Sequence, residues 1–409
     1  MSHSYSRIGL ILLSKVGGIL ATLIFLPEYQ RLLGDKLFGL VAIILSVQAF
    51  ALVVDFGFST LVNRAASVKS KAEGHHYWSS VQKLLFFLYV LILFIVIIIS
   101  HYLSWNYKIT VPVVLLIYLL VSHNISSFYL LGKEEITLSS LSLLASAFFR
   151  SIGGVIGILY FSGVEGFIFG QLIATFFVWL WVNIKIYQQV AVKIQYKSEY
   201  INILGHSKVL MFVGVAGAAV LQFDKFIIGY FISLETVSAY FLAMTLCSVP
   251  LAIFGTPIFQ YFQPLITKAY HSRDIRKVVT LSKLFNYCLV CIFMGCIIGY
   301  HLFSEWFIFV WLGSTETAVQ VKEYSDLMIY AYLVAMFGYW GFMLMNAYED
   351  YRFQSIMSIS LSVIVISLVV YFSINQEVWS IIYLYITYHS LSMLIGNIRG
   401  INIVKKLKG

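Results

Sequence analysis

The chain has 409 residues, of which 60% are hydrophobic and 11% charged, and its mean hydropathy is +0.89. A soluble domain carries roughly 25% charged residues, so this composition excludes a soluble enzyme, a disordered chain and a nucleic-acid-binding domain, and requires a lipid bilayer as solvent. The net charge of +9 is interpreted as Lys and Arg gathered in cytoplasmic loops rather than as a polyanion-binding surface.

Twelve apolar runs follow one another along the chain, each near the length of about 20 residues that a membrane-spanning helix needs. Residues 1–7 lead directly into the first run with no small-residue cleavage site, so we expect a first spanning helix rather than a removed signal. The twelve runs are Ile8–Pro27, Leu37–Phe58, Leu84–Tyr107, Ile109–Gly132, Ile136–Val164, Gly166–Ile184, Val209–Leu234, Thr236–Thr267, Leu284–Ser304, Leu327–Tyr348, Phe353–Gln376 and Val378–Ile398.

The charges between these runs predict the orientation of the chain. With the N-terminus in the cytoplasm, the inner segments hold 20 of the 27 Lys and Arg residues but only 7 of the 18 acids. The outer segments hold four basic residues against nine acids. Because Lys and Arg accumulate on the cytoplasmic side, we expect a multi-pass membrane protein with both termini in the cytoplasm.

A basic segment near the midpoint divides the chain into two halves. We predict an N-terminal six-helix bundle at residues 1–190, a basic cytoplasmic linker at 191–208 and a C-terminal six-helix bundle at 209–409. A short echo supports a parallel repeat, since LGDKLFG at residues 33–39 and SLETVSAY at residues 233–240 open the second helix of each half. The expected fold is all-α, with two bundles related by a pseudo-two-fold axis along the membrane normal.

The sequence carries no motif for a cofactor or a metal. A G-x-x-x-x-G-K-[ST] phosphate loop and an H-E-x-x-H pattern are both absent. The four cysteines lie in apolar runs without His or acidic neighbours at ligand spacing, so we expect small core residues rather than a metal or redox site. They are Cys247, Cys288, Cys291 and Cys296.

Three motifs in the right order carry a resemblance to a known family. They are LPEYQRLLGDKLFGL at residues 26–40, DFGF at 55–58 followed by Asn63 and Arg64, and LQFDKFIIGYF at 221–231. Together they resemble bacterial polysaccharide exporters, the O-antigen and capsule repeat-unit flippases of the Wzx type. That family lies within the multidrug/oligosaccharidyl-lipid/polysaccharide (MOP) exporter superfamily. The resemblance implies two six-helix bundles arranged as a V around a central cavity.

Three cations lie at membrane depth. Arg150 has fourteen uncharged residues on each side, Lys15 lies about two turns inside the first run, and Lys225 lies past the middle of the seventh. Charges at bilayer depth are costly and normally face a cavity or a partner. We expect Arg150, Lys15 and Lys225 to line one solvated groove and to bind the diphosphate of a lipid-linked sugar. Lys15 could instead extend to the cytoplasmic headgroups.

Two carboxylates, Asp224 and Asp55, also lie at depth. Either could bind H⁺ or Na⁺ and couple export to an ion gradient. Asp224 adjoins Lys225, but neighbouring side chains point about 100° apart on a helix, so the two would meet different partners. The alternatives are a structural ion pair for Asp224 and, for Asp55, a capping role at the end of the second helix, near Asn63 and Arg64.

The predicted function is a flippase for undecaprenyl-diphosphate-linked oligosaccharide, working by alternating access without an enzymatic step. Its expected partners are that substrate, membrane lipids, a coupling H⁺ or Na⁺, and a polysaccharide polymerase with its chain-length regulator; no nucleic acid is expected. One alternative is an ion-coupled multidrug exporter, which deep cations disfavour. The other is a membrane-embedded polysaccharide polymerase or ligase, disfavoured because residues 305–326 hold four acids, one Lys and no His or Arg.

Overall fold

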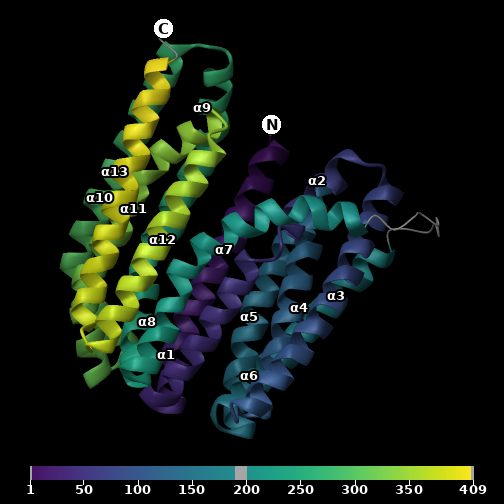
Figure 1. The fold of residues 1–409 in the computed structure, drawn as a ribbon, viewed down its shortest axis with the longest axis vertical. Coiled ribbons are helices and arrows are strands. Elements are labelled where there is room, and N and C mark those ends of the chain that lie inside the picture. The colour runs from purple at the N-terminus through teal and green to yellow at the C-terminus, as the bar shows by residue number, and fades with distance from the viewer. Residues whose placement is uncertain (1, 189–199, 407–409) are drawn as a thin grey trace. The chain divides into compact units, whose positions relative to one another are not determined.

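The computed structural model describes residues 2–188 and 200–406, with side chains at 14, 16–188, 203, 215 and 217–406. The described chain is helical throughout and contains no strand (Figure 1), which confirms the predicted all-α class. The helices are α1 (Ser2–Val53), α2 (Phe58–Val68), α3 (Lys71–Tyr102), α4 (Tyr107–Gly132), α5 (Ile136–Phe161), α6 (Gly163–Gln188), α7 (Tyr200–Phe231), α8 (Leu234–Pro250), the π-helical η1 (Leu251–Gly255), α9 (Thr256–His271), α10 (Ile275–Leu312), α11 (Glu316–Ala347), α12 (Tyr351–Ile374) and α13 (Val378–Lys406).

These helices are consistent with the twelve predicted spans. Ten helical stretches of the described chain are long and apolar enough to cross a membrane. The helix α7 is not one of these ten and lies between the fifth and the sixth of them along the chain. The first stretch, Val16–Val68, has 53 residues, more than twice the length of about 20 that one span needs. It bends at Gly34, whose φ of 72° and ψ of 166° suit only glycine, so α1 contains two spans.

Several helices begin well before their uncharged runs, because polar side chains cap them outside the apolar stretch. The Ser70 side chain accepts a hydrogen bond from the Glu73 backbone N–H, and Glu73 bonds back to Ser70, so α3 begins at Lys71 rather than at Leu84. The Thr315 hydroxyl likewise caps α11. The hydrophilic segments around 59–83 and 305–326 are therefore largely helical and form no separate extramembrane domain.

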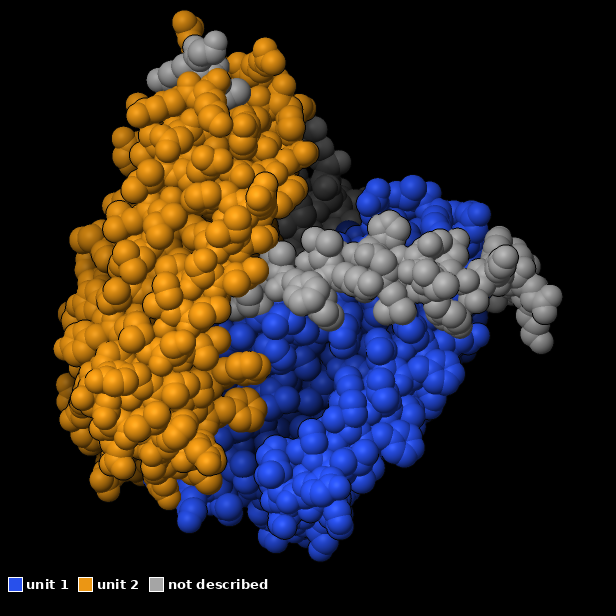
Figure 2. Space-filling view, viewed as in Figure 1, with its two compact units in different colours: residues 1–222 blue, residues 223–409 orange. Residues whose placement is uncertain are grey.

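The chain divides into two compact units, residues 1–222 and 223–409 (Figure 2). The boundary falls within α7. The predicted linker at 191–208 falls partly on residues 189–199, which lie outside the described residues, and its remainder is the first part of α7. The predicted domain boundaries therefore stay a prediction.

In unit 1, glycines set the closest helix contact. Gly153 and Gly157 of α5 face Gly170 and Gly166 of α6, and a Cβ on any of them would collide with the backbone of the other helix. Small residues four apart allow two membrane helices to approach this closely. The contact fixes α5, and with it the side chain of Arg150, against α6.

In unit 2, α11 is the central helix, packed against α8, α9, α10 and α13. Gly341 of α11 meets the backbone of α13 at Gly396, and the fully buried Leu344 lies against Gly400 beside this contact. Pro250 ends α8, and the π-helical turn η1 follows it before α9. A proline removes a backbone donor and breaks the regular ladder, which accounts for the irregular turn in this span.

Candidate functional site

Arg150 lies in unit 1, in the middle of α5, and the groups that meet its charge within the described part of the chain are neutral. Its Nη1 donates to Gln48 Oε1 over 3.4 Å, and Gln48 Nε2 in turn donates to Gln171 Oε1 over 3.0 Å. Gln48 and Gln171 are both 2% exposed. Arg150 lies on α5, Gln48 on the second half of α1 and Gln171 on α6. Their hydrogen bonds therefore link three helices of unit 1 through the amides of Gln48 and Gln171 to the guanidinium of Arg150.

Further polar groups surround this chain. The Tyr29 hydroxyl donates to the Ser151 carbonyl over 2.8 Å and lies close to Arg150. His123 of α4 is 3% exposed and interacts electrostatically with Arg150, and its Nε2 has no hydrogen-bond partner among the described residues. The Thr175 hydroxyl, one helical turn after Gln171 on α6, is also buried and has no partner in the described part of the chain. We call Arg150, Gln48, His123, Gln171 and Thr175 the Arg150 cluster.

The Arg150 cluster holds one formal positive charge and, among the described residues, no acid paired with it. An amide oxygen satisfies one guanidinium donor but cannot neutralise the charge. In a low-dielectric interior an uncompensated cation is costly, and an anion that reaches it is strongly stabilised. The chemistry available here is therefore anion binding, with the planar fork of the guanidinium suited to phosphate oxygens.

Lys225 and Asp224 lie in unit 2 and pair with each other. Lys225 Nζ is 2.9 Å from Asp224 Oδ1, and both side chains are 1% exposed. The expectation that these neighbours meet different partners is wrong, because the long Lys side chain bridges the angle between them. The alternative, an ion pair at depth, is what the structure contains.

Aromatic hydroxyls complete the surroundings of this pair. Tyr240 of α8 donates to Asp224 Oδ2 over 2.8 Å, and Tyr385 of α13 also contacts Asp224. Tyr332 of α11 lies nearby, with its ring 5.9 Å from that of His389. Both oxygens of Asp224 thus have a donor, which is the arrangement that makes a buried ion pair tolerable.

Asp55 lies in the break between α1 and α2 and caps α2. Its Oδ1 accepts from Gly57 N over 2.9 Å and its Oδ2 from Ser59 N over 3.1 Å. Phe56 and Gly57 both have positive φ, which turns the chain so that the carboxylate lies over the free N–H groups. These contacts cap the start of α2, whereas the sequence predicted the capping role at the end of the second run; the role in ion coupling stays a prediction.

The four predicted site residues whose side chains are described belong to two units. Arg150 and Asp55 belong to unit 1, and Asp224 and Lys225 belong to unit 2. The Lys15 side chain lies outside the described residues. A single groove shared by Arg150, Lys15 and Lys225 stays a prediction.

Sequence reasoning found Arg150 but missed Gln48, His123, Gln171 and Thr175. Neutral polar residues are common in membrane helices, and nothing in their spacing links α1, α4 and α6. The available signal was weak: each lies near the middle of an apolar run, where an unpaired polar group is costly. In the described chain no group of His, Cys, Asp and Glu could hold a metal ion.

Comparisons with known proteins relate the chain to one sequence family and one fold. Residues 6–270 match the family model described as a polysaccharide biosynthesis protein. No curated protein sequence matches the chain. An inward-facing multidrug resistance MATE family transporter of the MOP superfamily superposes with a TM-score of 0.70 at 13% identity, over 98% of each chain.

Two further solved structures have the same fold. A MATE transporter in complex with MaL6 gives a TM-score of 0.69 at 14% identity, over 98% of this chain and 97% of the other. A MOP superfamily transporter from Pyrococcus furiosus gives 0.62 at 13% identity, over 98% and 96%. The latter is described as having a binding pocket of reverse polarity that suggests a different function. The fold of this chain is therefore that of MATE-like MOP transporters.

Proposed function

The chain belongs to the polysaccharide biosynthesis protein family, and we propose that it is a flippase for undecaprenyl-diphosphate-linked oligosaccharide, the repeat unit of an O-antigen or capsule. It moves this lipid from the inner to the outer leaflet of the bacterial cytoplasmic membrane. The family match and the transporter fold support transport of a polysaccharide precursor. A transporter needs no cofactor and no covalent step.

The observation that carries the proposal is the Arg150 cluster. Moving a diphosphate across hydrocarbon costs most at the middle of the membrane, where water is absent. A guanidinium held there by Gln48, with no acid among its described partners, offsets that cost for an anion. The unpartnered Nε2 of His123 and hydroxyl of Thr175 are additional groups that can meet phosphate or sugar oxygens once the site opens.

The proposed mechanism is alternating access, with the ion gradient as the source of energy. Asp224 is the candidate for the coupling carboxylate, since protonation would release Lys225 from its ion pair and alter the contacts of Tyr240 and Tyr385. Lys15 and Lys225 are further candidates for the diphosphate. With the predicted orientation, both termini face the cytoplasm. The flipped lipid reaches the outer face of the membrane, where a polysaccharide polymerase and its chain-length regulator are the expected partners.

A multidrug exporter of the same fold is the competing transporter. Cationic drugs need acids that are free to bind them. Here Asp224 is paired with Lys225, and Asp55 accepts hydrogen bonds from the start of α2. A polymerase or ligase is disfavoured because α10 ends at Leu312 and α11 begins at Glu316, which leaves only a short connection on that side.

Accumulation of lipid-linked oligosaccharide in cells tests the proposed function. Deleting the gene in its native bacterium should stop surface polysaccharide production and leave intact lipid-linked repeat units on the inner leaflet, where an added glycosidase reaches them only after the membrane is opened. Re-expressing the wild-type protein should restore both. Loss of surface polysaccharide with repeat units still reaching the outer leaflet would assign the protein to a later step, such as polymerisation.

A further inference from the structure

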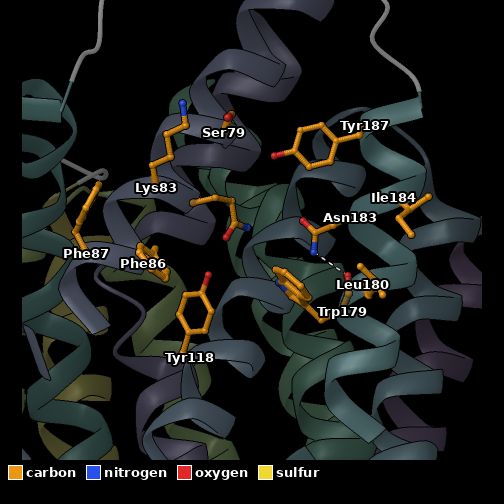
Figure 3. Close-up of a pocket in the computed structure, with 11 residues that line it drawn as sticks. Ser79, Lys83, Phe86, Phe87, Tyr118, Trp179, Leu180, Asn183, Ile184 and Tyr187 are labelled. Atoms are coloured by element: carbon orange, nitrogen blue, oxygen red, sulfur yellow. Dashed lines mark hydrogen bonds between the residues drawn. The ribbon is translucent and has the colours of Figure 1, made fainter. Parts of the chain in front are cut away.

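A hollow of about 530 Å³ opens in unit 1 between α3, α4 and α6 (Figure 3). Its volume lies within the range of about 300–1,000 Å³ typical of small-molecule sites. Ser79 and Lys83 lie on one wall and Asn183 and Tyr187 on the facing wall, and the Tyr118 hydroxyl points into the space between them (Figure 3). None of these residues belongs to the Arg150 cluster.

The hollow lies at the boundary between headgroups and hydrocarbon. Lys83 is the last charged residue before the uncharged run that begins at Leu84, and Lys185 is the first after the run that ends at Ile184. Both lysines therefore mark one membrane boundary. Beside Lys83, Phe86 is 49% and Phe87 66% exposed, so the surface next to the hollow faces acyl chains.

The inner wall of the hollow is fixed by its own hydrogen bonds. Ser122 Oγ donates to Gln82 Oε1 over 2.6 Å, Gln82 Nε2 donates to the Ser122 carbonyl over 3.0 Å, and Trp179 Nε1 donates to Ser122 Oγ over 2.7 Å. This network positions the wall before any ligand arrives, which reduces the ordering cost of binding.

Other donors at the hollow remain available. Within the described part of the chain, Lys83 Nζ and the hydroxyls of Tyr118 and Tyr187 make no hydrogen bond, and Lys83 has no ion pair. The lining contains one cation and no acid. That combination suits a group with a single negative charge and disfavours a zwitterion, whose ammonium would have no carboxylate to meet.

We propose that this hollow is a binding site for an anionic phospholipid with a hydroxylated headgroup, of the phosphatidylglycerol class. The lipid phosphate pairs with Lys83, the headgroup hydroxyls bond to Tyr118 and Tyr187, and the acyl chains cover Phe86 and Phe87. The site is separate from the Arg150 cluster and does not depend on the transported substrate.

Native mass spectrometry of the purified full-length protein tests the site, with phosphatidylglycerol and phosphatidylcholine of the same acyl chains as probes. The wild-type protein should retain one phosphatidylglycerol in preference to phosphatidylcholine. Lys83→Gln should lower that retention about five-fold or more, the loss expected for one charge-assisted hydrogen bond. Lys185→Gln is the matched control, because Lys185 lies at the same boundary outside the hollow, and it should retain the lipid as the wild type does.

Two further measurements complete the test. Ser79→Trp should fill the hollow and exclude the lipid while the protein stays monodisperse, and free glycerol phosphate should not displace the bound lipid. Displacement by glycerol phosphate would show a site for a soluble phosphate ester. Equal retention by Lys83→Gln and Lys185→Gln, or no preference between the two lipids, would overturn the proposal.

Discussion

Two cations at membrane depth have different partners in this protein. Arg150 meets the neutral oxygen of Gln48, whereas Lys225 meets the carboxylate of Asp224. The difference decides what each can do, because a paired charge stabilises its own surroundings and an unpaired one attracts an external ion. We therefore assign the main anion-binding role to Arg150. The ion pair of Lys225 is first a structural element, and any role in transport requires that it open.

Removing one member of the ion pair should cost more than removing both. Lys225→Met leaves Asp224 buried and unpaired, and the free energy of unfolding should fall by about 3 kcal/mol. The double variant Asp224→Leu with Lys225→Met leaves no charge and should recover most of that loss. Thermal unfolding of the purified proteins in one detergent measures the difference. Additive losses in the double variant would show that the two side chains do not depend on each other.

At the scale of helices, the sequence predicted where spans lie better than where helices begin. Apolar runs, four of which carry a charge, predicted a number of spans consistent with the described helices, because hydrocarbon sets a minimum length of apolar sequence. The same runs placed the start of α3 at Leu84 instead of Lys71. The cap at Ser70 extends this helix beyond the hydrocarbon into water, where charged side chains carry no desolvation cost. The partners of Arg150 escaped prediction for a different reason: they depend on which faces of four helices meet.

The contact between α5 and α6 should tolerate no added methyl group. Gly157→Ala would drive a Cβ into the Gly166 carbonyl, and overpacking of this kind costs about 1–3 kcal/mol. Gly295→Ala is the matched control, since a Cβ there meets open space; it should hold or raise stability, because Ala favours helix by up to about 1 kcal/mol. Melting temperatures of both variants give the comparison. A Gly157→Ala protein as stable as Gly295→Ala would mean that the two helices pack less closely.

Two substitutions at Asp55, in the break before α2, distinguish a capping role from a role in ion coupling. Asp55→Ala loses the acceptors for Gly57 and Ser59, and stability should fall by about 1 kcal/mol. Asp55→Asn keeps one of the two acceptor oxygens, so stability should fall by less than in Asp55→Ala, and transport should stay close to the wild type. Unfolding and transport are measured on the same preparations. If Asp55→Asn were stable but no longer transported, the carboxylate would have to carry a coupling ion.

At the scale of the whole molecule, the fold is that of known transporters, and the proposed cargo rests on the placement of the charges. The match to MATE structures at 13–14% identity extends over 98% of the chain, so the architecture is common to proteins whose cargoes differ. Composition and run lengths predicted the membrane-spanning helices, and the repeat and the family resemblance predicted their division into two bundles. The proposed cargo rests on a few side chains such as Arg150 and Gln48, because the fold alone does not select a cargo.

The most direct measurement is flipping by the purified protein in liposomes. A fluorescent undecaprenyl-diphosphate oligosaccharide is placed in both leaflets, and a quencher that cannot cross the membrane reports its exchange. The wild-type protein and the Arg31→Gln control, whose side chain is 74% exposed, should exchange the lipid rapidly. Arg150→Gln should slow exchange about ten-fold or more, and Arg150→Lys less, since Lys keeps the charge without the planar fork. Exchange by Arg150→Gln at the wild-type rate would contradict the account.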